Sequence, residues 1–412
     1  MSATAPSRLG ALRHRNFRLL FAGQFLSLVG TWMQSAAVLW HIASLVPPEE
    51  KALALGGVGL VKVVPIVVFA LAGGVLADAL DRRRMMFWMQ CLMAASAGLQ
   101  AVLTLQGLTS IWPLYILTGV NSAAAAFEGP ARQSLIPAIV PREDLPNAIS
   151  LNTMAFQMAA VAGPALTGIA YQWLGPGWIY AVNAVSFLAA IAAVILLRDL
   201  PRHAPENVVE LSPRSALEGL RFVFSHSLIR STMLVDFFAT FFSSAMALLP
   251  IFTQDILGRG AGTYGLLYSA PAIGAALTSL ILLRVEKHIV RRGRVLLWSV
   301  AAYGLATIVF GLSKSFWLMF VCLALTGAAD TVSMVIRNVL RQLTTPPHMR
   351  GRMTSVNMIF FLGGPQLGEM EAGALAHKVG AAASVVIGGI GSLISTAWIA
   401  KSTPALRNYR RE

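Results

Sequence analysis

The chain has 412 residues, of which 56% are hydrophobic and only 12% are charged, and its formal net charge is +14. Soluble domains carry about a quarter charged residues, so this composition excludes an ordinary soluble protein and indicates a polytopic membrane protein. In a soluble protein the positive charge would suggest nucleic-acid binding. In a membrane protein Lys and Arg collect in the cytoplasmic loops, so topology is the first explanation to test.

Motifs that carry enzyme chemistry are not found in the sequence. The two cysteines, Cys91 and Cys322, lie in separate apolar stretches, which predicts neither a disulfide framework nor a metal site. There is no glycine-rich phosphate loop and no His/Cys/acid cluster with the spacing of metal ligands. We therefore expect no enzyme activity, no metal and no cofactor, and the first apolar stretch predicts no cleavable signal peptide.

Residues 1–16 are short and basic and are predicted to be a cytoplasmic segment. Two series of six apolar stretches follow, and each stretch is long enough to cross a hydrocarbon core of about 30 Å as a helix. The predicted spans are 17–45, 54–77, 85–106, 110–131, 146–173 and 177–197, then 229–256, 262–284, 295–313, 315–338, 353–376 and 380–400. The sequence thus predicts an all-α polytopic protein of twelve transmembrane helices, with halves at 17–197 and 229–400.

The distribution of basic residues predicts the orientation. The predicted outer loops contain only Lys51, Arg259, Lys314 and Lys378, and Lys62 lies inside a span. All the other Lys and Arg residues fall in segments that are cytoplasmic if the N-terminus is inside. This asymmetry predicts that both termini, including the basic tail 401–412, face the cytoplasm, and it removes the need for a nucleic-acid partner.

Residues 198–228 are predicted to be a cytoplasmic connection between the halves. Ser212-Pro213 is a good helix start, and Leu217, Leu220 and Phe224 share one helical face. A short interfacial helix on the inner leaflet fits this pattern. A plain solvated linker is the alternative.

An internal repeat supports the division into two pseudo-symmetric six-helix halves. At one constant offset and without gaps, structural residues of the first half match those of the second, among them Arg132 with Arg337, Asn152 with Asn357 and Gly163 with Gly368. Two parallel halves around a site near the middle of the membrane are the arrangement that such a repeat implies.

The stretch Gly74-Val-Leu-Ala-Asp78-Ala-Leu-Asp81-Arg82-Arg83-Arg84 lies between the second and third spans. Two acids and three arginines cannot remain in hydrocarbon, so this stretch is predicted to be a short loop at a membrane face. It resembles the signature of the major facilitator superfamily at this position, although Ala79 replaces a common basic residue and Asp81 a usual glycine. The alternative is a positive-inside anchor, which explains the arginines but neither the acids nor Gly74.

The resemblance implies a latch on the cytoplasmic side. In the superfamily the acid at the position of Asp78 pairs with an arginine at the end of the fourth span, here Arg132, and faces the start of the eleventh, here near Arg352. A carboxylate is favoured both at a helix N-terminus and beside a guanidinium. Gly74 would allow a close approach of helices. The alternative for Arg132 is an anchor at the headgroups.

The fifth span contains Ala159-x-x-x-Gly163-Pro164-Ala-Leu-Thr-Gly168, which resembles the antiporter signature of the superfamily. Ala159 and Thr167 each replace a glycine of that signature. Small residues four positions apart permit close helix contact, and Pro164 bends the helix. In the family this feature accompanies exporters, so the resemblance favours efflux; a role in packing alone is the alternative.

Ionisable residues inside spans are costly and are therefore candidates for substrate or proton sites. They are Lys62, Glu128, Asp236, Asp330, Glu369 and Glu371. Asp236 and Asp330 lie deepest in the predicted spans and are the first candidates for proton coupling. Glu369 and Glu371 point in different directions on a helix, so they cannot both face one cavity. About half of the set are expected to be structural ion pairs or caps.

Further motifs resemble the bacterial efflux branch of the superfamily that includes the enterobactin exporter. They are Gly30-Thr31-Trp32-Met33-Gln34, Pro130-Ala131-Arg132-Gln133 and Arg350-Gly351-Arg352. The resemblance implies a monomer in the bacterial inner membrane that exports a small amphipathic molecule, siderophore or drug-like, by alternating access and driven by the proton gradient. The alternatives are an importer of the same fold and a membrane sensor or lipid-handling scaffold without transport.

Overall fold

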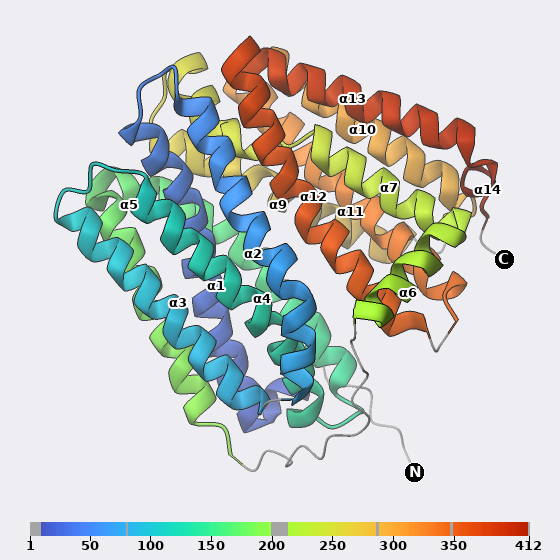
Figure 1. The fold of residues 1–412 in the computed structure, drawn as a ribbon, viewed down its shortest axis with the longest axis horizontal. Coiled ribbons are helices and arrows are strands. Elements are labelled where there is room, and N and C mark those ends of the chain that lie inside the picture. The colour runs from blue at the N-terminus through green and yellow to red at the C-terminus, as the bar shows by residue number, and fades with distance from the viewer. Residues whose placement is uncertain (1–9, 80, 199–212, 286–287, 347–348, 411–412) are drawn as a thin grey trace. The chain divides into compact units, whose positions relative to one another are not determined.

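The computed structural model describes residues 10–79, 81–198, 213–285, 288–346 and 349–410, and in parts of these ranges, including 70–79, it describes the backbone alone (Figure 1). Every regular element in these ranges is a helix. The first group comprises η1 (Gly10–Arg13), α1 (Arg15–Leu45), α2 (Lys51–Ala79), α3 (Arg82–Leu105), α4 (Trp112–Ile139) and α5 (Leu145–Ile195). After α6 (Pro213–Ser225) come α7 (Ser227–Phe242), η2 (Met246–Leu248), α8 (Leu249–Ile251), η3 (Phe252–Ile256), α9 (Ala261–Val285), α10 (Arg292–Leu312), α11 (Phe316–Thr344), α12 (Arg350–Val379), α13 (Ala381–Ser402) and α14 (Pro404–Arg407).

Each predicted span coincides with helix in the structure. The fifth and sixth spans lie in the single 51-residue stretch α5, which breaks at Gly175, where φ is 76° and the backbone is not helical. A positive φ suits glycine because it has no Cβ, and Pro176 follows as the first residue of the new helix. The Gly-Pro-Gly punctuation therefore separates the two spans as predicted.

Two spans differ from the prediction. The fourth was expected to end at residue 131, but α4 continues through Pro130 and Pro137 to Ile139, so Arg132 lies within the helix. The first span of the second half is not one continuous helix. It breaks after α7 at Ser243, resumes at η2, and ends in the π-helical turn η3. Pro250 lacks an amide hydrogen for the helix ladder, which favours a new helix start at this point.

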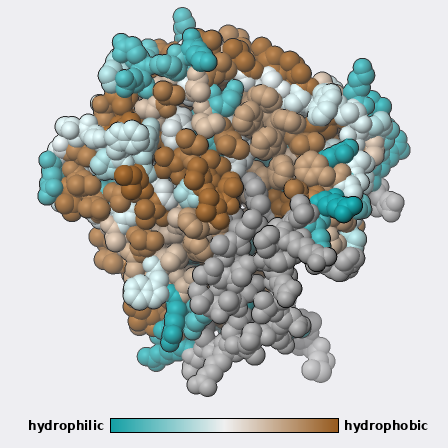
Figure 2. Space-filling model, viewed as in Figure 1, coloured by the Kyte–Doolittle hydropathy of each residue, from teal (hydrophilic) through white to brown (hydrophobic). Residues whose placement is uncertain are grey.

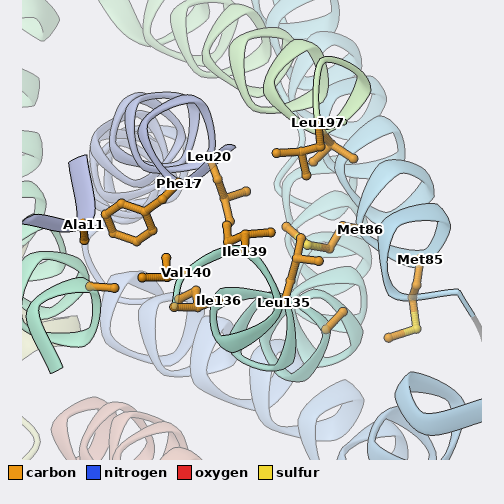
Figure 3. Packing of buried hydrophobic residues seen from close by; sticks show 13 residues of the cluster. Ala11, Phe17, Leu20, Met85, Met86, Leu135, Ile136, Ile139, Val140 and Leu197 are labelled. Atoms are coloured by element: carbon orange, nitrogen blue, oxygen red, sulfur yellow. The ribbon is translucent and has the colours of Figure 1, made fainter. Parts of the chain in front are cut away.

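The chain separates into two compact units, residues 1–38 with 68–210 and residues 39–67 with 211–412. In the first unit α3 packs along both α4 and α5. An apolar cluster in this unit includes Phe17 of α1, Met86 of α3 and Leu135 of α4, which are among the residues labelled in Figure 3. The cluster fixes the helix ends that carry the arginines of the predicted loop.

In the second unit α10 packs against α11 and α13, α9 packs against α11, and α12 packs against α7. The segment 39–67, which contains the end of α1 and the first half of α2, groups with this unit. The helix α6 begins at Pro213, as the sequence predicts, and packs on α12 and α7. The predicted domain boundaries and the interfacial position of α6 remain predictions.

The helices of both units carry many large apolar side chains on their outer surfaces, among them Trp173 (80% exposed), Leu283 (78%) and Trp298 (75%). Apolar residues also cover much of the face drawn in Figure 2. Eight helices in the described part of the chain are long and apolar enough to cross a membrane. Exposed apolar side chains on such helices are expected when lipid, not water, is the solvent.

Glycines bring neighbouring helices into backbone contact. A methyl group added at Gly274 of α9 would overlap the carbonyl group of Ala324 in α11, and one added at Gly327 of α11 would overlap Pro271 of α9. Such contacts matter in a bilayer because lipid tails are as apolar as the side chains, so helices associate through close packing. The α9–α11 contact is therefore a stabilising feature of the second unit.

We expect Gly274→Ala to lower the thermal midpoint of the detergent-purified protein, because the added methyl group must push α9 away from α11. Overpacking of this kind costs about 1–3 kcal/mol. Gly129→Ala is the matched control, since a methyl group at that helical position has no neighbour within 4 Å. Equal midpoints for the two variants would contradict the proposed role of the contact.

Candidate functional site

A buried ion-pair cluster joins α7 and α11 in the second unit. Arg337 of α11 donates through Nη1 to the Asp236 carboxylate of α7 and through Nη2 to Oδ1 of Asp330, 3.4 Å away. The side chains of Arg337 and Asp236 are 2% and 5% exposed, whereas that of Asp330 is 41% exposed. One guanidinium therefore holds two carboxylates, only one of which is open to its surroundings.

The positions on the helices explain this geometry. Asp330 and Arg337 are two turns apart on α11 and so lie on the same face. One turn further on, the buried Arg341 donates through Nε to the carbonyl oxygen of Arg337 and through Nη2 to Asn338. Arginine keeps its charge in proteins, so a buried guanidinium requires acidic or carbonyl partners.

A cavity of about 120 Å³ lies beside Asp330. Its lining includes Tyr303 and Thr307 of α10, Thr326 of α11 and Ser243 at the break after α7. The cavity is large enough for several water molecules. Because Asp330 borders the cavity, it is the carboxylate of the cluster that a proton or polar solute can reach.

The first unit has a related cluster around Arg132, the repeat partner of Arg337. Arg132 lies 3.3 Å from Glu128 one turn earlier on α4, and it also donates to Oδ1 of Asn152 in α5 over 3.5 Å. Gln24 of α1 donates through Nε2 to the same Glu128 oxygen, Oε1, at 3.3 Å. Glu128 is thus an ion-pair partner of Arg132, a structural role that the sequence allowed for about half of the buried acids.

The residues of the predicted loop have different roles. Asp81 caps α3 by accepting hydrogen bonds from the amides of Arg83 and Arg84, which explains an aspartate where the superfamily usually has glycine. Arg82 donates to the carbonyl oxygen of Ser134 at 3.0 Å. Arg83 donates to the carbonyl oxygens of Val194 and Ile195 at the end of α5. The contacts of Arg83 satisfy carbonyl oxygens in the last turn of α5, which lack intrahelical partners.

The structure does not describe the side chains at three positions of the predicted latch. Gly74 and Asp78 belong to the part of α2 in which only the backbone is described, and the side chain of Arg352 is likewise outside the description. The described partners of Arg132 are Glu128 and Asn152. The latch between Asp78 and Arg132 therefore remains a prediction.

The antiporter-like motif of α5 lies directly against α1. A methyl group added at Gly163 would lie 2.5 Å from Cβ of Trp32 and 2.9 Å from the carbonyl oxygen of Val29. Thr167 donates a hydrogen bond to the carbonyl oxygen of Met33 at 3.0 Å. Pro164 and Gly168 are both buried. The motif thus forms a close helix contact within the first unit.

Glu369 of α12 is buried and interacts electrostatically with Lys62 of α2. The two helices approach closely here, since a methyl group added at Gly59 would lie 2.8 Å from Cβ of Glu369. The oxygen Oε2 of Glu369 has no hydrogen-bond partner among the described residues. Glu371 is half-buried at a different angle on α12, as the helical geometry predicts.

Sequence reasoning identified Asp236 and Asp330 but did not assign a role to Arg337, which joins them. The internal repeat, which matches Arg337 with Arg132, was the sequence feature that could have indicated a role for Arg337. Tyr303, on the cavity wall, had no signal in the sequence. Among the described residues no group of three or more His, Cys, Asp or Glu side chains could hold a metal ion.

Comparison with known proteins shows similarity to membrane transport proteins along nearly the whole chain. The model of a family described as transmembrane secretion effectors matches residues 6–409. The enterobactin exporters EntS of Citrobacter koseri and Escherichia coli are 28% and 27% identical to the chain, over 97% of it and 94% of each exporter.

Solved structures extend the similarity to the fold. A bacterial homologue of the human lysosomal transporter Spinster, inward-facing and unoccupied, superposes with a TM-score of 0.73 at 15% identity, over 99% of this chain and 100% of that chain. An inward-facing bacterial homologue of the iron transporter ferroportin superposes with a TM-score of 0.70 at 16% identity, over 94% and 98%.

Removal of Asp236 should destabilise the protein far more than removal of Asp330. Asp236→Ala removes the buried partner of Arg337. Breaking a buried ion pair in this way lowers the free energy of unfolding by about 3–5 kcal/mol. Asp330→Ala removes a partner that is 41% exposed, for which less than about 1 kcal/mol is expected. Thermal unfolding of both purified variants measures the difference, and equal midpoints would contradict the assigned order.

Proposed function

Because this chain belongs to the transmembrane secretion effector family and has the major facilitator fold, we propose that it exports a small amphipathic molecule in exchange for protons. The all-helical class and the family predicted from the sequence are thereby confirmed, and the protein is a multi-pass membrane transporter, not an enzyme. The export direction, the coupling ion, the inner-membrane location and the cytoplasmic termini belong to the proposal.

The cluster of Asp236, Asp330 and Arg337 is the observation that supports proton coupling. Its two carboxylates and the two buried arginines, Arg337 and Arg341, balance in charge when both acids are ionised. Asp330 borders the cavity, and its contact with Arg337 is longer than that of Asp236. Protonation of Asp330 therefore loses less ion-pair energy than protonation of Asp236 would. Asp236, the more buried of the two acids, keeps Arg337 in place.

Protonation of Asp330 would remove its attraction for Nη2 of Arg337 and leave the cluster with one uncompensated positive charge. This change weakens a contact between two turns of α11 beside the break between α7 and η2. In a transporter of two halves such a change can bias one half against the other and so alternate access to a central site. Loss of the proton on the other side would restore the starting arrangement.

The energy available is sufficient for modest export. One proton that moves inward through 100 mV releases about 2.3 kcal/mol, enough to maintain roughly a 50-fold gradient of a neutral substrate at one-to-one exchange. No cofactor is required, because the proton gradient drives the cycle.

Two observations favour export of an amphipathic molecule. The relatives that the chain resembles along 97% of its length are named as exporters of enterobactin, a siderophore. The antiporter-like motif around Gly163 and Pro164 resembles one that accompanies exporters in the superfamily, and a role in packing α5 on α1 alone is the alternative. An identity of 28% supports the class of substrate and not the compound.

We expect Asp330→Asn to abolish substrate-dependent proton movement, because the amide cannot exchange a proton at this position. Proteoliposomes with an internal pH dye measure proton flux upon addition of siderophore-like and drug-like compounds. Glu143→Gln, which removes an exposed acid from the loop before α5, is the matched control and should retain the flux.

The same assay distinguishes the alternatives. Proton movement in Asp330→Asn at the wild-type rate would exclude this acid as the coupling site. Uptake of the compound together with protons would indicate an importer. Binding of the compound without any flux in the wild-type protein would indicate a sensor or lipid-handling scaffold.

Asp78→Asn should strongly reduce transport while membrane insertion stays normal, because the amide loses the charge that a latch with Arg132 and a helix N-terminus requires. Turnover in proteoliposomes and the amount of protein extracted from membranes measure the two effects separately. Wild-type turnover in this variant would count against the latch.

A further inference from the structure

A small basic pocket lies at one end of the second unit, where the chain after α13 folds back on the start of α10. Its volume is about 70 Å³. The lining consists of Asn408, Tyr409 and four arginines, namely Arg291, Arg294, Arg407 and Arg410. All four arginines are exposed, and none forms an ion pair with an acidic side chain of the residues that the structure describes. Within the described part of the chain, the pocket thus concentrates positive charge without a paired acidic side chain.

The backbone holds the pocket together. The amide of Gly293 donates a hydrogen bond to the carbonyl oxygen of Tyr409 at 3.1 Å, and a methyl group at Gly293 would overlap the carbonyl group of Leu406. Leu406 is fully buried in the apolar cluster of α7, α10, α11 and α13. The tail after α13 is therefore docked onto α10, which places Arg407 and Arg410 opposite Arg291 and Arg294.

The arginines at the start of the third spanning helix have different partners in the two units. In the first unit the arginines at the start of α3, the third spanning helix of that half, donate to backbone carbonyl oxygens: Arg82 to Ser134, and Arg83 to Val194 and Ile195. The helix α10 is the third spanning helix of the second half. Its N-cap residue Arg291 makes no side-chain cap. Here the basic side chains surround a pocket, and the dipole of α10 adds positive potential at the same place.

An exposed tryptophan near the pocket points to a position at the depth of lipid headgroups. Trp298, one turn into α10 from Arg294, is 75% exposed. Exposed tryptophans on spanning helices concentrate at the membrane–water interface. Arginine clusters bind phosphate groups through paired N–H donors, and basic pockets at helix ends near the cytoplasmic leaflet suit anionic lipid headgroups. The volume is several times what one water molecule needs, which is room for a phosphate group.

We propose that Arg291, Arg294, Arg407 and Arg410 form a phosphate site that binds the headgroup of an anionic lipid such as phosphatidylglycerol. The site is independent of the ion-pair cluster of Arg337 and of the proposed proton coupling. Its occupant would tie the C-terminal tail and the start of α10 to the lipid leaflet. Free phosphate offers the same oxygen acceptors as a lipid headgroup, so the experiment must distinguish these two ligands.

The test measures equilibrium binding of fluorescent phosphatidylglycerol to the full-length protein in mixed micelles, with phosphatidylcholine as the uncharged reference. We expect Arg291→Gln together with Arg294→Gln to weaken binding by about 10- to 30-fold, because each basic residue near a headgroup contributes to attraction. Both side chains are exposed, so the variant should elute and unfold as the wild type does in the absence of anionic lipid.

Arg13→Gln together with Arg142→Gln is the matched control, because it removes the same charge from exposed positions outside the pocket. This control should bind phosphatidylglycerol as the wild type does. Equal weakening in the two double variants would overturn the proposal in favour of general surface charge, and wild-type binding in both would overturn it as well.

Inorganic phosphate distinguishes the source of the ligand. Weak competition by millimolar phosphate supports a lipid headgroup as the occupant. Complete displacement by phosphate, with the same dependence on Arg291 and Arg294, would overturn the lipid as the occupant and assign the pocket to a soluble phosphate compound.

Discussion

The second unit depends on how a permanent positive charge is accommodated inside spanning helices. The side chain of Arg337 is 2% exposed, and a guanidinium does not lose its proton in proteins. Isolated in an apolar interior it would cost far more than the whole stability of a domain. Asp236 and Asp330 supply the counter-charge, and this requirement fixes the rotation of α7 and α11 about their axes. The same requirement leaves one carboxylate at a cavity, where a change in its charge has consequences for the whole cluster.

The two halves place an arginine at repeat-related positions but compensate it differently. Among the described side chains, Arg132 is paired with Glu128 on its own helix and donates to Asn152, while Gln24 donates to Glu128. Arg337 shares two acids from two helices. A second acid on one arginine allows one acid to gain and lose a proton while the other keeps the arginine paired. The two acids on Arg337 are therefore the physical reason that supports the proposed coupling site in the second half.

Close helix contact is the other condition for these clusters. Lipid provides no hydrophobic drive for helix association, so the backbones must approach through small residues. Gly163 against α1, Gly274 and Gly327 between α9 and α11, and Gly59 against Glu369 all provide such approaches. Polar side chains near them are held at fixed distances because the backbones cannot slide apart without loss of packing. The basic pocket also depends on a glycine, because the missing side chain of Gly293 allows the C-terminal tail to contact α10.

The sequence by itself determined the class of protein, the positions of the spans and the family. These follow from one-dimensional signals: lengths of apolar stretches, the placement of Gly175-Pro176-Gly177, and the motifs around Asp81 and Gly163. It also identified Asp236 and Asp330 as costly residues inside spans. The break after α7 could not be predicted, because Ser243 and Pro250 fit a kinked continuous helix equally well. Only the tertiary structure decided that Arg337 joins Asp236 of another helix to Asp330, and that two arginine pairs distant in sequence line one pocket. Partners of this kind depend on the rotation of each helix and on contacts between remote segments, and neither is encoded in spacing along the chain.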